Sequence, residues 1–424
     1  MTQPLNTEWL QQLPRLQGKP GLERINRLLD LLGNPQNQMD FVHVAGTNGK
    51  GTVCTFVANI LKEAGYKTGL TISPYVLDFR ERFQINGEMI SMQDLERLAE
   101  RVRIAVEQMP EGVAQFEAVT ALALLWFYEQ GCQIGVLETG LGGRYDATNA
   151  VSRTLVAAIT RIDLDHTELL GDTLEEIAAE KAGIIKPGCT VVSYPLQDDE
   201  VHRVIVAECI RQKAELIRPN AEDIRLLDMM SAFENRFDYG GYLIDLNLLG
   251  AHQVCNAVMA VEVALALWHK GYEIDDNAIC EGLKKATFPA RLEVMRKNPI
   301  VLLDGAHNPA GVAALVGTLE SLKCKQPVAV IGMMADKNCE EMLRMLLPHV
   351  DRVYTVTPCC SRAMSAAALA DCVKKICPQK EAVVCDSVQH GLELALQQEK
   401  DLLICGSLYL AAEARPELEK YFKK

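Results

Sequence analysis

Short apolar runs alternate with longer segments of helical periodicity through the first two thirds of the chain. Runs of about five apolar residues predict buried strands, and apolar positions spaced three and four apart predict helices that bury one face. The Asn86-Gly87 pair predicts a hairpin turn. Strands are predicted at 39–45, 67–72, 134–138, 154–160 and 190–193, and a β-rich patch at 237–248. Helices are predicted at 22–32, 52–65, 91–109, 116–130, 173–185, 199–213 and 251–268.

A second and more regular rhythm starts near residue 299. Five apolar runs, each followed by a helical segment, predict a doubly wound sheet: PIVLLD, PVAVIGMM, DRVYTVTP, EAVVCD and DLLICG. The segment 287–298, TFPARLEVMRKN, separates the two rhythms and is interpreted as a linker. The pattern therefore predicts two α/β domains, 1–296 and 297–424, with the crevice between them as the natural active site.

The composition is that of an ordinary globular chain. With 424 residues it has room for two or three domains, and 49% hydrophobic and 23% charged residues are ordinary proportions. No stretch approaches the roughly 20 apolar residues of a membrane-crossing helix, and the N-terminus lacks a signal pattern. The 14 cysteines contain no CxxC pair, which predicts reduced thiols and a cytoplasmic location. The net charge of −13 argues against nucleic-acid binding, so we expect neither a nucleic-acid nor a membrane partner.

A glycine-rich turn, HVAGTNGKGTVC at 43–54, joins the first predicted strand to the next helix. It departs from the Walker pattern, because Val44 and Gly51 stand where a glycine and a Ser or Thr are required. Its ingredients remain: backbone N–H groups at a helix N-terminus, the charge of Lys50, and the Thr52 hydroxyl for Mg²⁺. The alternative is an ordinary turn whose glycines only supply positive φ angles. We interpret the turn as a phosphate cradle because Lys50 and Thr52 stand where phosphate and metal need them.

Polar side chains lie where predicted strands end. Ser73, Glu138 and His166 each end or follow a strand, and ligands of open α/β sheets bind beyond the carboxyl ends of strands. Together with Thr52 they offer mixed oxygen and nitrogen ligands for Mg²⁺. Each of them alone is as well explained as a helix cap or turn residue, so only their shared location favours a site.

A second glycine-rich loop, ETGLGGRYDATNA at 138–150, starts from the same predicted sheet edge. It is interpreted as a wall of the same pocket. Lys181 stands among alanines and Gly183 in EEIAAEKAGIIKPG, and small neighbours allow a close approach to another element. Spacing alone nevertheless favours an ordinary solvated lysine at this position.

Eight segments resemble, in order, the folylpolyglutamate synthase/dihydrofolate synthase family, a relative of the Mur ligases. They run from about residue 20 to residue 410: GTNGKGT, ISPYVLDFRER, LETGLGGRYDATN, DHTELLGDTLEEIAAEKAGIIKPG, LLGAHQVCNA, FPARLEV, LDGAHNPAG and GSLYL. EKAGIIKPG together with LDGAHNPAG is far more specific than any phosphate-loop pattern. The resemblance implies an N-terminal P-loop ATPase domain with a mostly parallel sheet, followed by a smaller Rossmann-like glutamate-ligase domain.

The resemblance also implies the reaction. ATP phosphorylates a substrate carboxylate, and the amine of L-glutamate displaces phosphate from the acyl phosphate. A carboxylate is a poor electrophile because its oxygen does not leave, and phosphorylation solves that problem. The implied cofactors are ATP and Mg²⁺, the substrates are dihydropteroate, folates and L-glutamate, and we expect a monomer.

Site residues carry over position by position. The implied ATP contacts are Asn48, Gly49, Lys50, Gly51, Thr52, Asn256, Arg291 and Asp304. The implied pterin pocket is lined by Gln115, Phe116, Tyr145 and Ala147. The implied Mg²⁺ ligands are Thr52, Ser73, Glu138, His166 and Lys181, the last as a carbamate. The implied catalytic residues are Lys50, Lys181, Asp304 and His307.

One departure and three alternatives accompany this interpretation. Relatives often have His after Ser-Pro, whereas this chain has Tyr75, which affects the folate side of that loop. One alternative is polyglutamylation of tetrahydrofolate without dihydrofolate synthesis. A Mur-type ligase acting on a UDP-sugar peptide or another carboxylate is the second, although only about 40 residues precede the cradle, too few for a UDP-binding domain. A regulatory P-loop ATPase is the third, but it has no need for the Lys181 helix.

Overall fold

The computed structural model describes residues 7–15, 20–227, 233–324 and 326–423. The chain forms two compact units. The first comprises Met1–Arg225, Asp238–Ile244 and Cys255–Ala286, and the second comprises Leu226–Phe237, Asp245–Val254 and Thr287–Lys424. The boundary expected between residues 296 and 297 falls inside a strand of the second unit.

The first unit is built on an eight-stranded sheet in the order β4-β3-β2-β5-β1-β6-β7-β8. Its strands are β1 (Asp40–Ala45), β2 (Thr68–Thr71), β3 (Gln84–Ile85), β4 (Glu88–Met89), β5 (Ile134–Glu138), β6 (Thr154–Ile159), β7 (Thr190–Ser193) and β8 (Glu215–Ile217). The strands from β2 to β8 in this order are parallel, whereas β3 pairs antiparallel with β2 and β4 pairs antiparallel with β3. The carboxyl ends of the parallel strands therefore meet at one edge.

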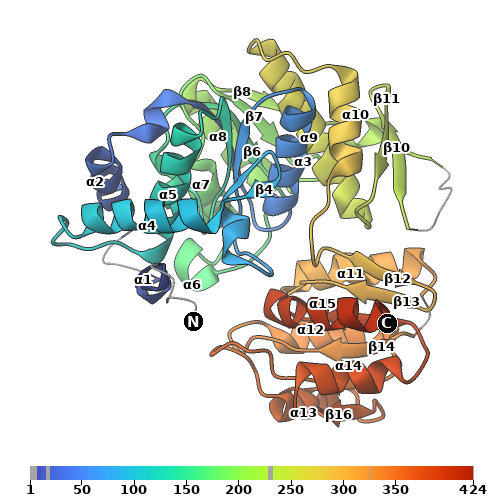
Figure 1. The fold of residues 1–424 in the computed structure, drawn as a ribbon. Helices are drawn as coiled ribbons and strands as arrows, with labels where there is room; N and C mark the ends of the chain where they lie inside the picture. The colour runs from blue at the N-terminus through green and yellow to red at the C-terminus, as the bar shows by residue number, and fades with distance from the viewer. Residues whose placement is uncertain (1–6, 16–19, 228–232, 325, 424) are drawn as a thin grey trace. The chain divides into compact units, whose positions relative to one another are not determined.

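Helices cover both faces of this sheet (Figure 1). One core joins α2, α4 and α5 to residues of β1 and β5, and another joins α7 and α8 to β6 and β7. Helix α3 packs on β1, β2 and β5 and against α10. The helices are α1 (Glu8–Gln12), α2 (Glu23–Leu31), α3 (Lys50–Glu63), α4 (Met92–Val106), α5 (Gln115–Glu129), α6 (Thr167–Leu170), α7 (Leu174–Ala182), α8 (Asp199–Gln212), α9 (Ala251–His269) and α10 (Asp276–Lys285).

The second unit has a six-stranded sheet in the order β12-β13-β17-β14-β15-β16. Its strands are β12 (Glu293–Lys297), β13 (Ile300–Leu303), β14 (Val328–Ile331), β15 (Val353–Thr355), β16 (Ala382–Val384) and β17 (Leu402–Cys405). Its helices are α11 (Pro309–Ser321), α12 (Cys339–Leu346), α13 (Ala366–Ile376), α14 (Val388–Leu396) and α15 (Leu408–Phe422). Helices α11, α12 and α13 share one core with the sheet, while α14 and α15 pack together against β14 and β17, which is the doubly wound arrangement expected.

Most predicted elements form within a few residues of their expected ends, including the hairpin, where Asn86 and Gly87 both have positive φ. The linker interpretation of 287–298 is wrong in part, because 293–297 is β12, which pairs antiparallel with β13. Strands β10 (Asn235–Tyr239) and β11 (Tyr242–Leu246) account for the β-rich patch predicted at 237–248, and β9 (Ile224–Leu226), which was not predicted, completes a sheet in the order β11-β10-β9. Helix α10 and strand β8 were not predicted.

Among the described residues, helix α9 is long and apolar enough to cross a membrane by length and composition alone, a test that a buried core helix also passes. In the fold, 72% of its apolar window is buried inside the protein. Helix α9 therefore has the burial of a core helix.

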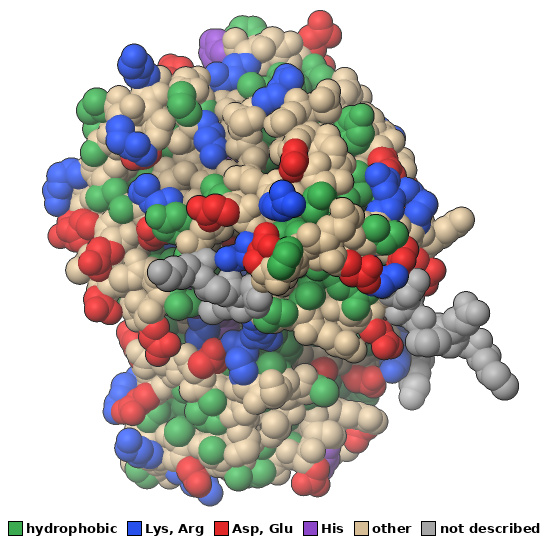
Figure 2. Space-filling model, turned by 90° about the vertical axis from the view of Figure 1, so that its left-hand side faces the viewer, with side chains coloured by type: hydrophobic (Ala, Val, Ile, Leu, Met, Phe, Trp, Pro, Cys, Tyr) green, Lys and Arg blue, Asp and Glu red, His purple; other side chains and the backbone are tan. Residues whose placement is uncertain are grey.

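Over the face drawn in Figure 2, acidic and basic side chains are interspersed.

Candidate active site

The candidate site lies at the carboxyl edge of the large sheet. In the parallel ladders Val44 pairs with Glu138, and Thr71 pairs with Leu137. The segments that follow β1, β2 and β5 therefore leave the sheet side by side. The backbone N–H of Ser73 donates a hydrogen bond of 2.8 Å to Glu138 Oε2, so the two residues meet as the sequence predicts.

The predicted phosphate cradle is the turn between β1 and α3. Gly49 is the N-cap of α3 with φ +89°, and the helix begins at Lys50. The N–H groups of a first helical turn have no acceptor within their helix, and the helix dipole favours an anion there. A Cβ atom on Gly49 would lie 2.6 Å from Asn256 Oδ1, so the Asn256 side chain packs directly on the turn. Thr52 is buried with 3% of its surface exposed.

Lys50 folds back over this turn, where its Nζ donates to the Thr47 carbonyl oxygen over 3.2 Å. The turn is held from behind by the segment after β6. The N–H groups of Thr47 and Asn48 both donate to the Arg161 carbonyl oxygen, at 2.9 and 3.2 Å. Asn48 Nδ2 donates to Asp163 Oδ2 over 3.0 Å. Asp163 thus holds the cradle in place; its position after a strand was apparent in the sequence, but it was assigned no role there.

Lys181 is buried, with 4% of its surface exposed, in the last turn of α7. Its Nζ donates 2.7 Å to the carbonyl oxygen of Gly46, at the start of the cradle. Burial and the nearby charge of Lys50 lower the pKa of Lys181 to about 7. The interpretation of this residue as a solvated lysine is therefore wrong, and its small neighbour Gly183 serves the close packing, since a Cβ on Gly183 would lie 2.5 Å from Arg144 Cβ.

His166 lies beyond the same edge as the N-cap of α6, with φ +52°. Its side chain is half exposed, and its Nε2 lies 4.0 Å from Asp165 Oδ2. Within the described residues, His, Cys, Asp and Glu side chains form no group of three or more that could hold a metal ion.

The predicted pterin pocket joins the start of α5 to the loop after β5. A Cβ on Gly140 would lie 2.8 Å from the Phe116 ring, so ring and loop backbone are in contact. The Gln115 side chain is directed elsewhere, because its Nε2 donates a hydrogen bond of 3.0 Å to the Leu10 carbonyl oxygen. Tyr145 is 53% exposed, whereas Ala147 is buried at 6%. Phe116 and the loop are thus brought together, while the Gln115 side chain contacts the N-terminal segment instead.

Three predicted residues belong to the second unit. Asp304 follows β13, and its carboxylate accepts backbone hydrogen bonds from Leu292 and Ala306, both of 2.8 Å. Burial raises the pKa of Asp304. Arg291 lies over the Phe288 ring at 5.4 Å. His307 follows Asp304 along the loop, with its Nδ1 3.1 Å from the Gly305 carbonyl oxygen.

Backbone conformation singles out Arg291. Its neighbours Ala290 and Leu292 have φ of +58° and +49°, in the left-handed region that residues with side chains rarely adopt. Such strain persists where surrounding bonds impose it. Asp304 binds the Leu292 N–H, and Glu293 Oε2 accepts from the Ala290 N–H over 3.0 Å. The two carboxylates therefore fix the backbone on both sides of Arg291.

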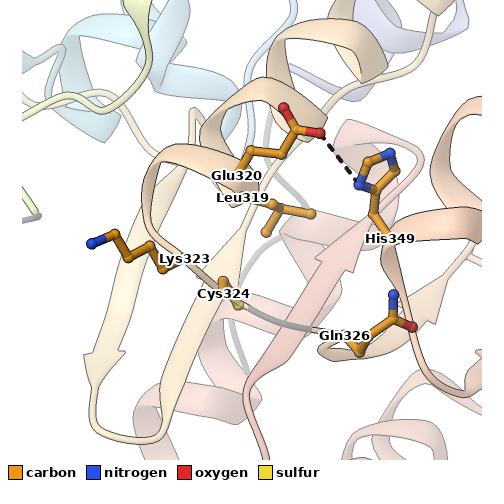
Figure 3. A pocket seen from close by; sticks show the side chains of 6 residues that line it. All are labelled: Leu319, Glu320, Lys323, Cys324, Gln326 and His349. Atoms are coloured by element: carbon orange, nitrogen blue, oxygen red, sulfur yellow. Dashed lines mark ion pairs between the residues drawn. The ribbon is translucent and has the colours of Figure 1, made fainter.

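A separate surface pocket of about 460 Å³ lies in the second unit, at the edge of the sheet where strands β14 and β15 begin (Figure 3). It is lined by Leu319, Glu320, Lys323, Cys324, Gln326 and His349, which come from the end of α11 and from the segments that lead into β14 and β15. Within it, His349 Nδ1 lies 3.8 Å from Glu320 Oε1 (Figure 3). Ligands of such sheets bind at the carboxyl edge, so this pocket is not a candidate active site.

Comparison with known families gives two matches. The model of the Mur ligase middle domain matches residues 44–264, and the model of the Mur ligase glutamate ligase domain matches residues 290–408. The first covers the cradle, Glu138, Lys181 and Asn256. The second covers Arg291, Asp304 and His307.

Known proteins resemble the chain over nearly its full length. Dihydrofolate synthase/folylpolyglutamate synthase of Bacillus subtilis is 33% identical over 97% of this chain and 98% of its own. The structure of Mycobacterium tuberculosis folylpolyglutamate synthase complexed with ADP has a TM-score of 0.89 at 32% identity, covering 97% of both chains. The structure of Escherichia coli FolC in complex with DHPP and ADP has a TM-score of 0.86 at 29% identity, covering 99% of both chains.

Proposed function

Because the chain belongs to the dihydrofolate synthase/folylpolyglutamate synthase family of Mur ligases, we propose that it performs both reactions of that family in one site. It is an ATP-dependent ligase that forms an amide bond to the amine of L-glutamate. The acceptors are the carboxylate of dihydropteroate, giving dihydrofolate, and the γ-carboxylate of tetrahydrofolates, giving polyglutamates.

One observation carries the assignment of the chemistry to the sheet edge: Lys181 Nζ donates to Gly46 of the cradle over 2.7 Å. A turn that only binds phosphate does not require a buried amine that is hydrogen-bonded to its first carbonyl oxygen, that of Gly46. A ligase does, because it must hold both the phosphates of ATP and the carboxylate that attacks them. The regulatory ATPase alternative leaves this contact without a purpose.

The steps follow from the groups at the edge. A substrate carboxylate oxygen attacks the γ-phosphorus of ATP, the bond to the β-phosphate oxygen breaks, and ADP leaves. The amine of glutamate then attacks the acyl carbon, loses a proton, and expels phosphate with the original carboxylate oxygen. Phosphoryl transfer of this kind is catalysed by positioning and by spreading charge over the phosphate oxygens. Lys50 and the N–H groups of Gly49, Gly51 and Thr52 supply that positive potential.

Magnesium fits the ligands that this edge provides. Mg²⁺ is commonly bound through one or two carboxylates together with substrate phosphates and waters. Glu138 would supply the carboxylate, and the hydroxyls of Thr52 and Ser73 and the imidazole of His166 would supply further ligands. When bound, the ion neutralises charge on the transferring phosphate.

Lys181 suits carbamylation. The neutral amine attacks CO₂, loses a proton and becomes an anionic carbamate that is able to bind a second Mg²⁺. A pKa of about 7 means that much of this amine is neutral near neutral pH, unlike an ordinary lysine. Carbamylation also removes the cost of a cation buried beside Lys50.

The remaining assignments rest on the resemblance of the segments that carry them. Asn256, Arg291 and Asp304 contact ATP, and His307 assists at the phosphate or at glutamate. Phe116 stacks on the pterin, beside Tyr145 and Ala147, whereas the Gln115 side chain is engaged with Leu10 and contributes through its place at the start of α5. The first unit binds ATP and folate and the second is the glutamate-ligase domain. The protein acts as a cytoplasmic monomer on small molecules alone.

A two-substrate assay tests the function. Purified protein receives ATP, Mg²⁺ and glutamate with either dihydropteroate or tetrahydrofolate in separate tubes, and phosphate release and product mass are measured. We expect glutamate-dependent turnover with both. Turnover with tetrahydrofolate alone reduces the protein to a polyglutamate extender, and turnover with neither contradicts the assignment.

A further inference from the structure

A buried chain of polar groups lies beneath the loop after β5, and none of the steps above uses it. His43 on β1 is fully buried. Its Nε2 lies 2.8 Å from Thr148 Oγ1, a residue 105 positions further along the chain. Thr148 Oγ1 and its backbone N–H both bind Asp146 Oδ1, the N–H over 3.0 Å.

The same carboxylate holds the start of the loop. Asp146 Oδ2 accepts hydrogen bonds from the N–H groups of Gly140 and Leu141, both of 2.9 Å. Asp146 is itself 6% exposed, so its charge depends on these four donors. One buried carboxylate thus ties both ends of the segment 140–148 together.

The direction of each hydrogen bond is fixed by chemistry. An ionised Asp146 carboxylate only accepts, so the Thr148 hydroxyl donates to it and accepts from His43, which assigns the proton of the neutral ring to Nε2. Among the described residues, Nδ1 of His43 has no hydrogen-bond partner. Burial and the charge of Lys186 lower the pKa of His43 to about 3, so the ring stays neutral and the donor stays in place.

The segment so held carries the wall of the proposed pterin pocket. Gly140 contacts the Phe116 ring, and Tyr145 and Ala147 lie on either side of Asp146. The opposite side of the segment packs on α7, because Arg144 N–H donates to the Glu180 carbonyl oxygen over 2.8 Å. A shift at Asp146 therefore moves the wall against Phe116.

We propose that His43 and Thr148 are positioning residues for the pterin substrate, acting through Asp146 on the segment 140–147. The proposal rests on the proposed function, because it takes this segment and Phe116 as the pterin pocket. Neither His43 nor Thr148 needs to touch the substrate. Their role is to hold the wall at one distance from the ring that stacks on the pterin.

The test compares Thr148→Val with Thr148→Ser and Thr154→Val. Valine matches threonine in shape but has no hydroxyl, and serine restores the hydroxyl. Thr154 is a matched control, because it is 6% exposed on β6 and its hydroxyl makes no hydrogen bond within the described residues. The readouts are KM for dihydropteroate, KM for ATP, kcat and melting temperature.

We expect Thr148→Val to raise KM for dihydropteroate about tenfold, the effect of losing one buried hydrogen bond in a network with a charged group, while KM for ATP stays within about twofold. Thr148→Ser restores the wild-type KM, and Thr154→Val leaves both KM values unchanged. His43→Phe raises the same KM and adds little to Thr148→Val in the double variant, because both break one chain. His43→Gln, which keeps a donor, leaves KM for dihydropteroate near the wild-type value, and Thr148→Val alone carries the test where the phenylalanine variant fails to fold.

Equal losses of melting temperature in Thr148→Val and Thr154→Val, with KM for dihydropteroate unchanged in both, overturn the proposal. Phe116→Ala separates this failure from that of the pocket itself. If Phe116→Ala raises KM for dihydropteroate and Thr148→Val does not, only the positioning role is overturned. If Phe116→Ala also has no effect, the pterin pocket is misplaced and both claims fall.

Discussion

The Nζ atom of Lys181 lies 2.7 Å from the carbonyl oxygen of Gly46, although the two residues are 135 positions apart. This hydrogen bond joins the last turn of α7 to the turn that precedes α3. It places a buried amine on the cradle, within reach of the charge on Lys50. This contact brings a titratable amine to the proposed phosphate cradle, on which the proposed chemistry depends.

Replacing Lys181 by alanine should abolish ligation, because the proposed carbamate and its metal-binding charge can no longer form. Small carboxylic acids such as acetate fill the vacated space and supply a carboxylate, so they should restore part of the activity in a concentration-dependent manner. Phosphate release is the measurement, and wild-type protein with the same acids is the control. A fully active Lys181→Ala enzyme rules out the role.

The pKa of Lys181 also predicts how stability changes with pH in buffers without CO₂. The folded state gives up the lysine proton near pH 7, whereas an unfolded chain keeps it up to the ordinary value of 10.5. Between these two pH values the unfolded state binds more protons than the folded state does. The free energy of unfolding therefore increases as the pH rises. Urea unfolding at about pH 7 and about pH 10 should show wild type gaining stability relative to Lys181→Met. An unchanged difference between the two proteins contradicts the lowered pKa.

Lys50→Ala should lower kcat by about a hundredfold or more, because the charge that is proposed to stabilise the transferring phosphate is removed. Lys62→Ala is the matched control, since Lys62 is an exposed lysine in the last turn of the same helix. Both variants should keep the wild-type circular dichroism spectrum. Equal activity of the two variants removes the cradle from the mechanism.

Two glycines with nearly equal φ allow backbone strain to be separated from a clash. Gly49 has φ +89° and would place a Cβ 2.6 Å from Asn256 Oδ1, whereas Gly65 has φ +88° with no atom within 4 Å. Alanine at either position costs about 1 kcal/mol of stability through the left-handed backbone. Only Gly49→Ala should also raise KM for ATP, by about tenfold or roughly 1.4 kcal/mol of binding. A similar KM for ATP in both variants shows that Asn256 and Gly49 do not shape the nucleotide site.

Local patterns in the sequence predicted more of the fold than of the site. Apolar periodicity predicted the strands and helices around the cradle because each depends on neighbours in sequence. Strand β12 was missed because most of it is only partly buried and it pairs through one edge with β13, which leaves no apolar run in the sequence. Helix α10 was not predicted, although Asp275 caps its N-terminus. Its apolar residues are few, and they pack against α3, a contact that the sequence of α10 alone does not reveal.

The site residues divide in the same way. Ser73 and Glu138 were expected together because both end parallel strands, and the structure joins them by a hydrogen bond. Lys181 at Gly46, Asp163 at Asn48 and Thr148 at His43 pair residues over 100 positions apart. Such pairings depend on tertiary packing, which spacing along the chain does not encode, so resemblance to a family was needed to single out Lys181.

The transfer of isotopic oxygen tests the central claim, that the cradle activates a carboxylate by phosphorylation. Dihydropteroate labelled with ¹⁸O in both carboxylate oxygens is turned over with ATP, Mg²⁺ and glutamate, and the released phosphate is analysed by mass spectrometry. An acyl phosphate predicts one ¹⁸O atom in each inorganic phosphate and the other in the new amide. Unlabelled phosphate, or label in AMP with release of pyrophosphate, contradicts the account.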